Sequence, residues 1–429
     1  MQSIGLPEKV LHELNLTLYK FIWQRRHTNR RAFEKVKRVV MESDPEYGGL
    51  KMLNINDMQR AFYLQWVAKL KASNGQKWTL IPLYLISKVV KGFGIFNFNA
   101  KPSKIGGLGK IKNAFWKTVI TTWLSEKHIT PLEQVDESNF SHQSLWYNEL
   151  VKYRGSLLYY HSWQARGFQT VQDIIKMDER RLLSMDEVKG IVGDRGTMMF
   201  EYNALVNALP KQWMQWVQTS DGVVDHHDLL TFNGMNVHNY KAKDFRLLLK
   251  EKKIQDLNAC AVGFWKRKFA FALDKEVWKK INAATKETRL RELQWKILHN
   301  IYPTNILLSK MKVKSNNKCI FCPGEVDYIE HFFFDCCLVR KFWKYVEGKV
   351  LQLLSNHVTI TMTDVLFGLQ ERKDLNQGQV NMIDHILMIG KMCISIKKKT
   401  NSSTALPIFS LATSGVQKHH TKVNLILVY

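Results

Sequence analysis

The sequence predicts a mainly α-helical protein with three helical regions and a small metal-binding module near its C-terminal end. Three observations support this prediction. Apolar residues recur at helical spacing through most of the 429 residues. A single pair, Asn233–Gly234, gives a clear β-hairpin signal, because it tolerates the positive φ angles of a tight turn. Four potential metal ligands fall within the short segment from Cys319 to Cys336.

The first region, residues 1–91, is expected to contain two helices separated by a basic segment and a turn. Apolar side chains recur every three or four residues after Pro7, a residue favoured in the first turn of a helix. Gly48–Gly49 then marks the turn, and Asp57 is expected to cap the second helix. Aromatic and aliphatic residues spaced four apart are expected to form the face of that helix: Phe62, Trp66 and Leu70.

The second region is expected over residues 92–263, with one hairpin. It opens with a glycine- and lysine-rich linker over 92–109, in which Phe96 and Phe98 form a strand-like patch. Helical spacing then predicts helices over three stretches: 115–123, 171–192 and 197–209.

The third region, residues 264–400, is expected to begin with long basic helices over 265–308 and to end with a helix over 380–397. Between them, a helix is expected to follow the cysteine segment. Its apolar face is expected to consist of Leu338, Phe342, Tyr345 and Val346. Residues 401–429 are Ser/Thr-rich and without pattern, so we expect a poorly ordered tail.

The composition is strongly basic. Sixty-three Lys and Arg residues against 38 Asp and Glu give a formal charge of +25, which predicts a polyanionic partner. Aromatic residues scattered among these cations favour RNA or DNA, because rings stack on bases while cations hold phosphates. Charge alone leaves an anionic membrane surface open. However, the sequence has no secretory signal and no apolar run of about 20 residues, so we expect a protein of the cytoplasm and nucleus with reduced cysteines and no membrane partner.

A cluster of cations follows the first predicted helix, and we expect it to contact nucleic-acid phosphates. It interrupts apolar helices and agrees in sign with the net charge. The alternative is a solvated helix face. The residues concerned are Arg25, Arg26, Arg30, Arg31, Lys35, Lys37 and Arg38.

The segment CIFCPGEVDYIEHFFFDC contains the pattern C-x2-C-x8-H-x4-C. Two cysteines three residues apart can hold one ion from a tight turn, and a histidine and a cysteine near the next helix can complete a tetrahedron. Three thiolates and one imidazole suit a structural zinc ion, since all four positions are filled by protein. The predicted ligands are Cys319, Cys322, His331 and Cys336. Phe332, Phe333 and Phe334 are expected to form a miniature core that depends on the ion.

The cysteine segment also allows two alternatives to this zinc site. Free cysteines can cluster by chance in a core, and Cys337 could replace Cys336 as the fourth ligand. Elsewhere, His226 and His227 stand between two aspartates, but no further ligand has suitable spacing, so a polar loop is expected there. His299 lies in an apolar helical pattern and is expected to be a packed core histidine.

The segments CIFC, IEHFFFDC and LVRKFW together resemble the C-terminal zinc-binding region of reverse transcriptases from non-LTR (long interspersed element, LINE) retrotransposons. Earlier segments resemble other parts of this family in the family's own order. LNLTLYKFIW and EYGGLKMLNINDMQRAFYLQWV are similar to the start of the thumb, and SLWYNEL, WQARGFQTVQDII, NALPKQW and RLRELQWKILHNIYPTN follow. MIGKMCISIKKKT is similar to the last helix of the family, so the resemblance covers residues 4–400.

The resemblance implies a thumb-like region at 1–91 and an RNA-directed DNA polymerase as the parent protein. The parent's palm holds Mg²⁺ through carboxylates that include an Asp-Asp pair, and this sequence contains no such pair. We therefore expect a C-terminal fragment without palm and endonuclease, inactive alone, which binds element RNA or target DNA. A polymerase would need the rest of the reverse transcriptase to be supplied separately. A zinc-containing protein-interaction module and a degraded element copy without selected function are the alternatives.

Overall fold

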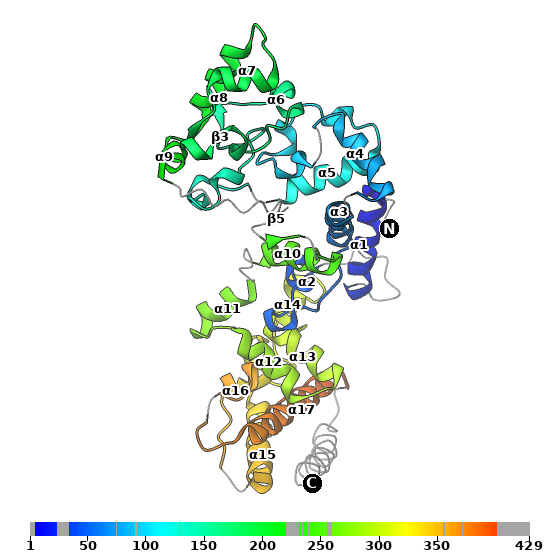
Figure 1. Ribbon diagram of the computed structural model, residues 1–429. Coiled ribbons are helices and arrows are strands. Elements are labelled where there is room, and N and C mark those ends of the chain that lie inside the picture. Colours follow the sequence, from blue (N-terminus) through cyan, green and yellow to red (C-terminus); the bar gives the residue numbers. More distant parts are fainter. Residues whose placement is uncertain are drawn as a thin grey trace, which may run out of the picture. The chain divides into compact units, whose positions relative to one another are not determined.

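The computed structural model shows a mainly helical chain, as the sequence predicts (Figure 1). Its strands form three two-stranded antiparallel pairs within the described residues. The structure describes residues 5–23, 34–73, 75–90, 93–127, 129–219, 231–232, 235–237, 240–254, 260–354, 357–370 and 372–400.

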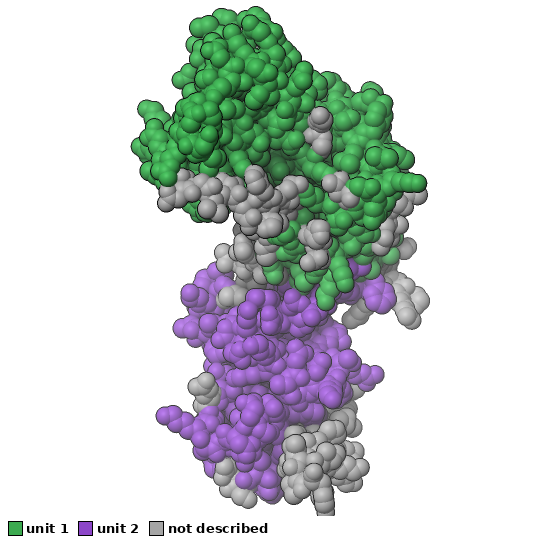
Figure 2. Space-filling view, viewed as in Figure 1, with its two compact units in different colours: residues 1–18, 54–252 green, residues 19–53, 253–429 purple. Residues whose placement is uncertain are grey.

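The chain divides into two compact units, which are coloured separately in Figure 2. Unit 1 contains residues 1–18 and 54–252, and unit 2 contains residues 19–53 and 253–429. The predicted limit between residues 91 and 92 lies inside unit 1. The segment 19–53, predicted as part of the N-terminal region, groups with the C-terminal half of the chain.

The longer helices of unit 1 are connected by short 3-10 helices and hairpins. The α-helices are α1 (Glu8–Trp23, which continues into unit 2), α3 (Ile55–Ala72), α4 (Leu80–Ser87), α5 (Ala114–Glu126), α6 (His161–Ala165), α7 (Met185–Val192), α8 (Met198–Ala208), α9 (Lys211–Thr219) and α10 (Ala242–Ile254, which ends in unit 2). The 3-10 helices are η2 (Lys77–Thr79), η3 (Gly94–Asn97), η4 (Pro102–Lys104), η5 (Leu108–Lys110), η6 (Leu132–Gln134), η7 (Phe140–His142), η8 (Val171–Ile174) and η9 (Met177–Glu179). The strands are β1 (Lys152–Tyr153), β2 (Ser156–Leu157), β3 (Ile175–Lys176), β4 (Arg181–Leu182), β5 (Thr231–Phe232) and β6 (Met235–Asn236).

An aromatic core holds unit 1 together around the packing of α3 against α5. Trp123 and Trp146 are fully buried, and their indole N–H groups donate to the backbone carbonyls of Phe96 (2.9 Å) and Phe168 (2.6 Å). These bonds leave no polar ring atom of either indole unpaired in the apolar interior. β5 and β6 pair antiparallel on either side of the predicted turn residues 233–234, which themselves lie outside the described residues.

Three details of unit 1 differ from the predictions. Phe96 belongs to a 3-10 helix and is buried in the main core, so the strand-like patch was wrong. The cap of α3 is Asn54, whose side chain accepts the N–H of Asp57, because Asn is itself a strong N-cap residue. The helix predicted over 171–192 forms only at its end. Arg180 adopts a left-handed backbone (φ +48°) that reverses the chain, and Ser184 then starts α7 with a capping box.

Unit 2 contains the remaining helices, and a second core lies among them. Its elements are α2 (Arg38–Glu42), η1 (Pro45–Tyr47), α11 (Cys260–Phe269), α12 (Lys275–Ala284), α13 (Thr288–Leu298), α14 (Asn305–Lys310), the π-helix η10 (His331–Asp335), α15 (Cys337–Leu354), α16 (Met362–Phe367) and α17 (Gln377–Thr400). The long helices predicted over 265–308 are four shorter ones. Left-handed residues at Ala270 (φ +52°) and Asn300 (φ +54°) follow α11 and α13, which explains two of the breaks.

The apolar face predicted for α15 was displaced by one residue. Leu338 and Tyr345 are exposed, whereas the buried stripe consists of Val339, Trp343, Val346 and Val350. These four residues lie on one face of α15 over three turns. Helical spacing alone does not select this face, because Leu338 and Phe342 fit the spacing as well as Val339 and Trp343 do.

The turn at Gly48 joins the segment 19–53 to the core of unit 2. Gly48 has φ +80°, and a Cβ there would lie 2.7 Å from the Trp278 ring, so glycine is required on both counts. Its carbonyl accepts hydrogen bonds from the Trp295 indole (2.8 Å) and from Nε2 of His299 (2.7 Å). The predictions of a turn at Gly48 and a packed core histidine at His299 are confirmed.

Candidate metal centre

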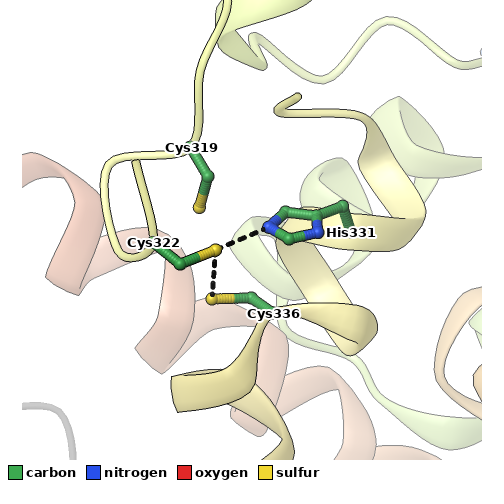
Figure 3. A group of neighbouring side chains, drawn as sticks. All are labelled: Cys319, Cys322, His331 and Cys336. Atoms are coloured by element: carbon green, nitrogen blue, oxygen red, sulfur yellow. Dashed lines mark hydrogen bonds between the residues drawn. The ribbon is translucent and has the colours of Figure 1, made fainter. Parts of the chain in front are cut away.

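A short loop brings the first two cysteines of the motif together. Lys318 and Val326 form an antiparallel bridge, and the N–H of Cys319 donates to the carbonyl of Glu325 (2.8 Å). The chain between them turns back within a few residues, so Cys319 and Cys322 face the same side of the loop (Figure 3). The N–H of Phe321 lies 3.4 Å from Sγ of Cys319.

The other two residues of the motif lie at the two ends of a single π-turn. The N–H of Cys336 donates to the carbonyl of His331 (2.9 Å), five residues earlier. In an α-helix with about 3.6 residues per turn, residues five apart lie on different faces. The wider π-turn therefore allows a histidine and a cysteine with four residues between them to meet the same point, and such turns are frequent at functional sites.

The four side chains converge (Figure 3). Their ligand atoms all lie within 4.8 Å of one another, Sγ of Cys322 is 3.1 Å from Nε2 of His331, and Sγ of Cys336 is 3.6 Å from Sγ of Cys322. A tetrahedral zinc ion with Zn–S bonds of about 2.3 Å separates its sulfur ligands by about 3.8 Å. The cluster is therefore of the size that one zinc ion needs, and its donor set of three sulfurs and one imidazole fits the preference of zinc.

Cys336 and Cys337, the two candidates for the fourth ligand, differ in their exposure. Cys336 is fully buried and belongs to the cluster, whereas Cys337 is exposed and lies outside it. The structure thus brings together Cys319, Cys322, His331 and Cys336, the four residues predicted as ligands, and leaves the alternative Cys337 apart.

The thiols of the cluster are held in an apolar setting. Burial, together with the neighbouring sulfurs, raises the pKa of Cys322 to about 12 when no cation is present. Burial also raises the pKa of Cys336, while backbone N–H groups of Val339 and Leu338 at the start of α15 act in the opposite direction. A bound divalent cation would reverse this balance, because a coordinating thiol loses its proton.

The aromatic residues beside the cluster do not form a separate miniature core. Phe332 and Phe333 are fully buried within the main core of unit 2. Phe332 stacks on Tyr302 and Phe321, and Phe333 packs edge-on against Tyr302. Trp343 of α15 donates its indole N–H to the carbonyl of Phe333 (2.7 Å). The prediction of a separate miniature core was wrong, because these rings pack against helices distant in sequence within the main core. The dependence of this segment on the ion stays a prediction.

Asp327 is a supporting residue that the sequence analysis missed. It is fully buried, and its carboxylate accepts the N–H of Asn305 (2.5 Å) and pairs with Lys398 of α17 (3.1 Å). Nζ of Lys398 also lies 4.6 Å from the centre of the Phe332 ring. These contacts connect the metal loop to α14 and α17. Three other acidic residues lie between the ligand positions, Glu325, Glu330 and Asp335, so no local signal in the sequence distinguishes Asp327.

The predicted basic cluster is described only in part. Arg25, Arg26, Arg30 and Arg31 lie outside the described residues, as do His226, His227 and the tail 401–429. Arg38 pairs with Glu34 (2.5 Å) and lies over the Tyr19 ring, and the hydrogen bond to Glu34 raises the pKa of Arg38. Lys35 is half-buried and Lys37 is exposed. Phosphate contacts by these residues remain a prediction.

Comparison with known proteins agrees with the geometry. Residues 263–343 match a family model described as zinc-binding in reverse transcriptase. The matched segment includes all four residues of the cluster. None of the curated proteins matches this chain. Among the described helices, none has the length and apolarity required to cross a bilayer. The match, together with the Cys₃His cluster, supports a protein related to reverse transcriptases whose C-terminal part is suited to bind zinc.

Proposed function

We propose that this chain is a zinc-containing, nucleic-acid-binding part of a reverse transcriptase of the non-LTR (LINE) type. The observation that carries the proposal is the coincidence of the Cys₃His cluster with the family match over residues 263–343. The formal charge of +25 supports a nucleic-acid partner, which would be element RNA or target DNA.

The zinc ion would have a structural role. Cys319, Cys322, His331 and Cys336 fill all four tetrahedral positions, so no position is left for a water or substrate. The ion would join the loop after Cys319 to the start of α15. It would also fix the end of an exposed basic segment that comes directly before Cys319: Lys310, Lys312, Lys314 and Lys318.

Binding rather than catalysis is the proposed activity of this chain alone. Polymerases of the resembled family hold Mg²⁺ with an Asp-Asp pair, and the sequence has none. We infer that primer extension requires a palm, which these 429 residues do not supply. A thumb-like role for residues 1–91 belongs to the same proposal.

The test is binding of a labelled RNA and of a DNA duplex at increasing salt. Because phosphate contacts release counterions, 6–10 contacts would reduce affinity about a thousandfold or more between 50 and 200 mM salt. Affinity that hardly changes with salt, or no binding at all, would refute the nucleic-acid proposal.

A zinc-containing protein-interaction module is the second candidate. It is favoured by exposed apolar side chains on α7 and α8, where Ile191, Met199 and Phe200 are 46%, 59% and 75% exposed. Capture of a defined partner that resists high salt, and is lost in Phe200→Ser, would favour this function.

A further inference from the structure

One stretch of unit 1 combines high positive charge with a complete absence of acidic residues. Between residues 58 and 125 the sequence has no Asp and no Glu. The same stretch contains eleven cations: Arg60, Lys69, Lys71, Lys77, Lys88, Lys91, Lys101, Lys104, Lys110, Lys112 and Lys117. Charged surfaces usually alternate in sign, so this segment produces a positive field that its own residues do not neutralise.

Acidic residues outside the stretch pair with two of these cations. Arg60 contacts Glu126 (3.1 Å), and Lys104 contacts Glu149 (2.7 Å). Several others are exposed on the surface of α4, α5 and the connecting segments: Lys77, Lys88, Lys101, Lys110, Lys112 and Lys117.

Three aromatic rings from separate elements meet in this stretch. Trp66 of α3 lies 6.0 Å from Trp78 of η2 and 5.7 Å from Phe115 of α5, measured between ring centres. Trp78 is 37% exposed, and the other two rings are half-buried. We call these three residues the aromatic platform. It lies where α3 and α5 pack together in unit 1 (Figure 1).

Each ring of the platform has a lysine close to it in the sequence. Nζ of Lys69 lies 5.0 Å from the centre of the Trp66 ring, one helical turn along α3. Lys77 directly precedes Trp78, and Lys112 comes three residues before Phe115. Lys112 also precedes Asn113, the N-cap of the 13-residue helix α5, and a helix N-terminus attracts phosphate.

We propose that the aromatic platform and Lys69, Lys77 and Lys112 bind single-stranded nucleic acid, with an unpaired base against Trp78 and the backbone phosphates on the lysines. This inference rests on the proposed function and adds the form of the nucleic acid and the place where it binds. Single strands offer base faces that a ring can stack on, whereas a duplex keeps its bases stacked inside.

An anionic membrane surface is the competing partner. Leu80 and Ile81 of α4 are 66% and 67% exposed, and apolar side chains beside lysines can enter a lipid interface. Tyr84 of α4 is also exposed and has Lys88 over its ring (4.1 Å). The platform favours nucleic acid, because its three rings come from three different elements and meet one another, which a stacked base can use. Vesicle binding is therefore an outcome that the experiment must measure.

The experiment compares the full chain with two variants, Trp78→Ala and the triple variant Lys69→Gln/Lys77→Gln/Lys112→Gln. The probes are 20-nucleotide single-stranded RNA, DNA of the same sequence, the matching duplex, and phosphatidylserine vesicles. Loss of one stacked base should weaken single-strand binding by Trp78→Ala about tenfold, with little effect on the duplex. Loss of three phosphate contacts should reduce the salt slope on single strands by about 2.

Matched controls come from the same unit. Phe200→Ala removes an aromatic that is 75% exposed, and Lys211→Gln/Lys241→Gln/Lys243→Gln removes the same charge from exposed lysines elsewhere. Both controls should bind single strands with affinity close to that of the unmodified chain. Unchanged circular dichroism and melting temperature identify the variants that have kept their fold.

The outcomes separate the inference from the proposed function. If the unmodified chain binds no nucleic acid, the proposed function fails. If it binds with strong salt dependence but the platform variants behave as their controls do, only this inference is overturned. It is also overturned if phosphatidylserine vesicles bind in a Trp78-dependent manner while single strands do not.

Discussion

The two units differ in what they bury. Unit 1 has one buried charged residue among its described residues, Asp57, and its large side chains are tryptophans and phenylalanines. Unit 2 buries three aspartates, a lysine and a histidine together with the thiols of the metal cluster. The buried charged or titratable residues other than the thiols are Asp327, Asp364, Asp384, Lys391 and His299.

Because of this difference, the stability of the two units should respond differently to pH and to metal ions. Aromatic burial and neutral hydrogen bonds depend little on protons or metal ions. In unit 2, burial lowers the pKa of Lys391 to about 7 and raises the pKa of Asp384 to about 6. In unit 1, burial lowers the pKa of Lys127 to about 8, which lies outside the range pH 4–7. We therefore expect zinc, and pH between 4 and 7, to change the stability of unit 2 more than that of unit 1.

Removal of zinc should give the largest effect. Zinc that binds only the folded state adds about 4 kcal/mol when its free concentration is a thousandfold above Kd. A chelator should therefore increase hydrogen exchange in residues 317–336 and the start of α15, where the cluster lies. The helices of unit 1 serve as the internal control. Equal loss of protection in both units would break the comparison.

Acid should weaken unit 2 through His299. Burial lowers the pKa of this imidazole from 6.5 to about 4, with a smaller opposing contribution from the Gly48 carbonyl. As pH falls from 6.5 to 4, the unfolded chain takes up a proton that the folded chain does not, so about 3 kcal/mol is lost.

The substitution His299→Gln isolates this contribution, because glutamine retains an N–H for Gly48 and does not titrate. Asp384 acts in the opposite direction over pH 4–6 and is unchanged in the variant. In chemical denaturation, the change in the free energy of unfolding from pH 7 to pH 4 should therefore be more favourable for the variant than for the unmodified chain, by about 3 kcal/mol. The same slope in both proteins would contradict the assignment.

Breaking the ion pair between Asp327 and Lys398 should give the next largest loss of stability. Asp327→Asn keeps an acceptor for the Asn305 N–H but loses the bond to the charged lysine, at a cost of about 2 kcal/mol. A double-mutant cycle with Lys398→Met measures the coupling by chemical denaturation. Fully additive losses would show that the pair does not join the metal loop to α17.

The smallest loss of stability is expected when an ion pair on the surface of unit 1 is broken. Arg181 and Glu187 form a pair (2.7 Å) with both side chains partly exposed. Arg181→Gln should lower the melting temperature less than Asp327→Asn does, and the difference from the unmodified chain should vanish at high salt. A larger effect than that of Asp327→Asn would reverse the contrast between the units.

The sequence predicted the features that depend on local spacing. The helical content, the turn at Gly48 and the convergence of C-x2-C with H-x4-C all follow from residues close together in the chain. The π-turn that brings His331 and Cys336 of the H-x4-C spacing together was not predicted, because hydrophobic periodicity alone does not distinguish a π-turn from an α-helix.

Features set by distant contacts were missed. Residues 19–53 join unit 2 because Trp278, Trp295 and His299, more than two hundred residues later, pack around Gly48. No local pattern encodes that association. The buried face of α15 was missed for a related reason, since several apolar registers fit its sequence and packing selects one.

The zinc content of two purified variants tests the central claim most directly. Cys336→Ser removes a residue of the cluster, whereas Cys337→Ser removes its exposed neighbour and serves as the matched control. We predict one zinc ion per chain for the unmodified protein and for Cys337→Ser by native mass spectrometry, and none for Cys336→Ser. A folded, metal-free unmodified chain, or zinc lost from Cys337→Ser and kept by Cys336→Ser, would contradict the account.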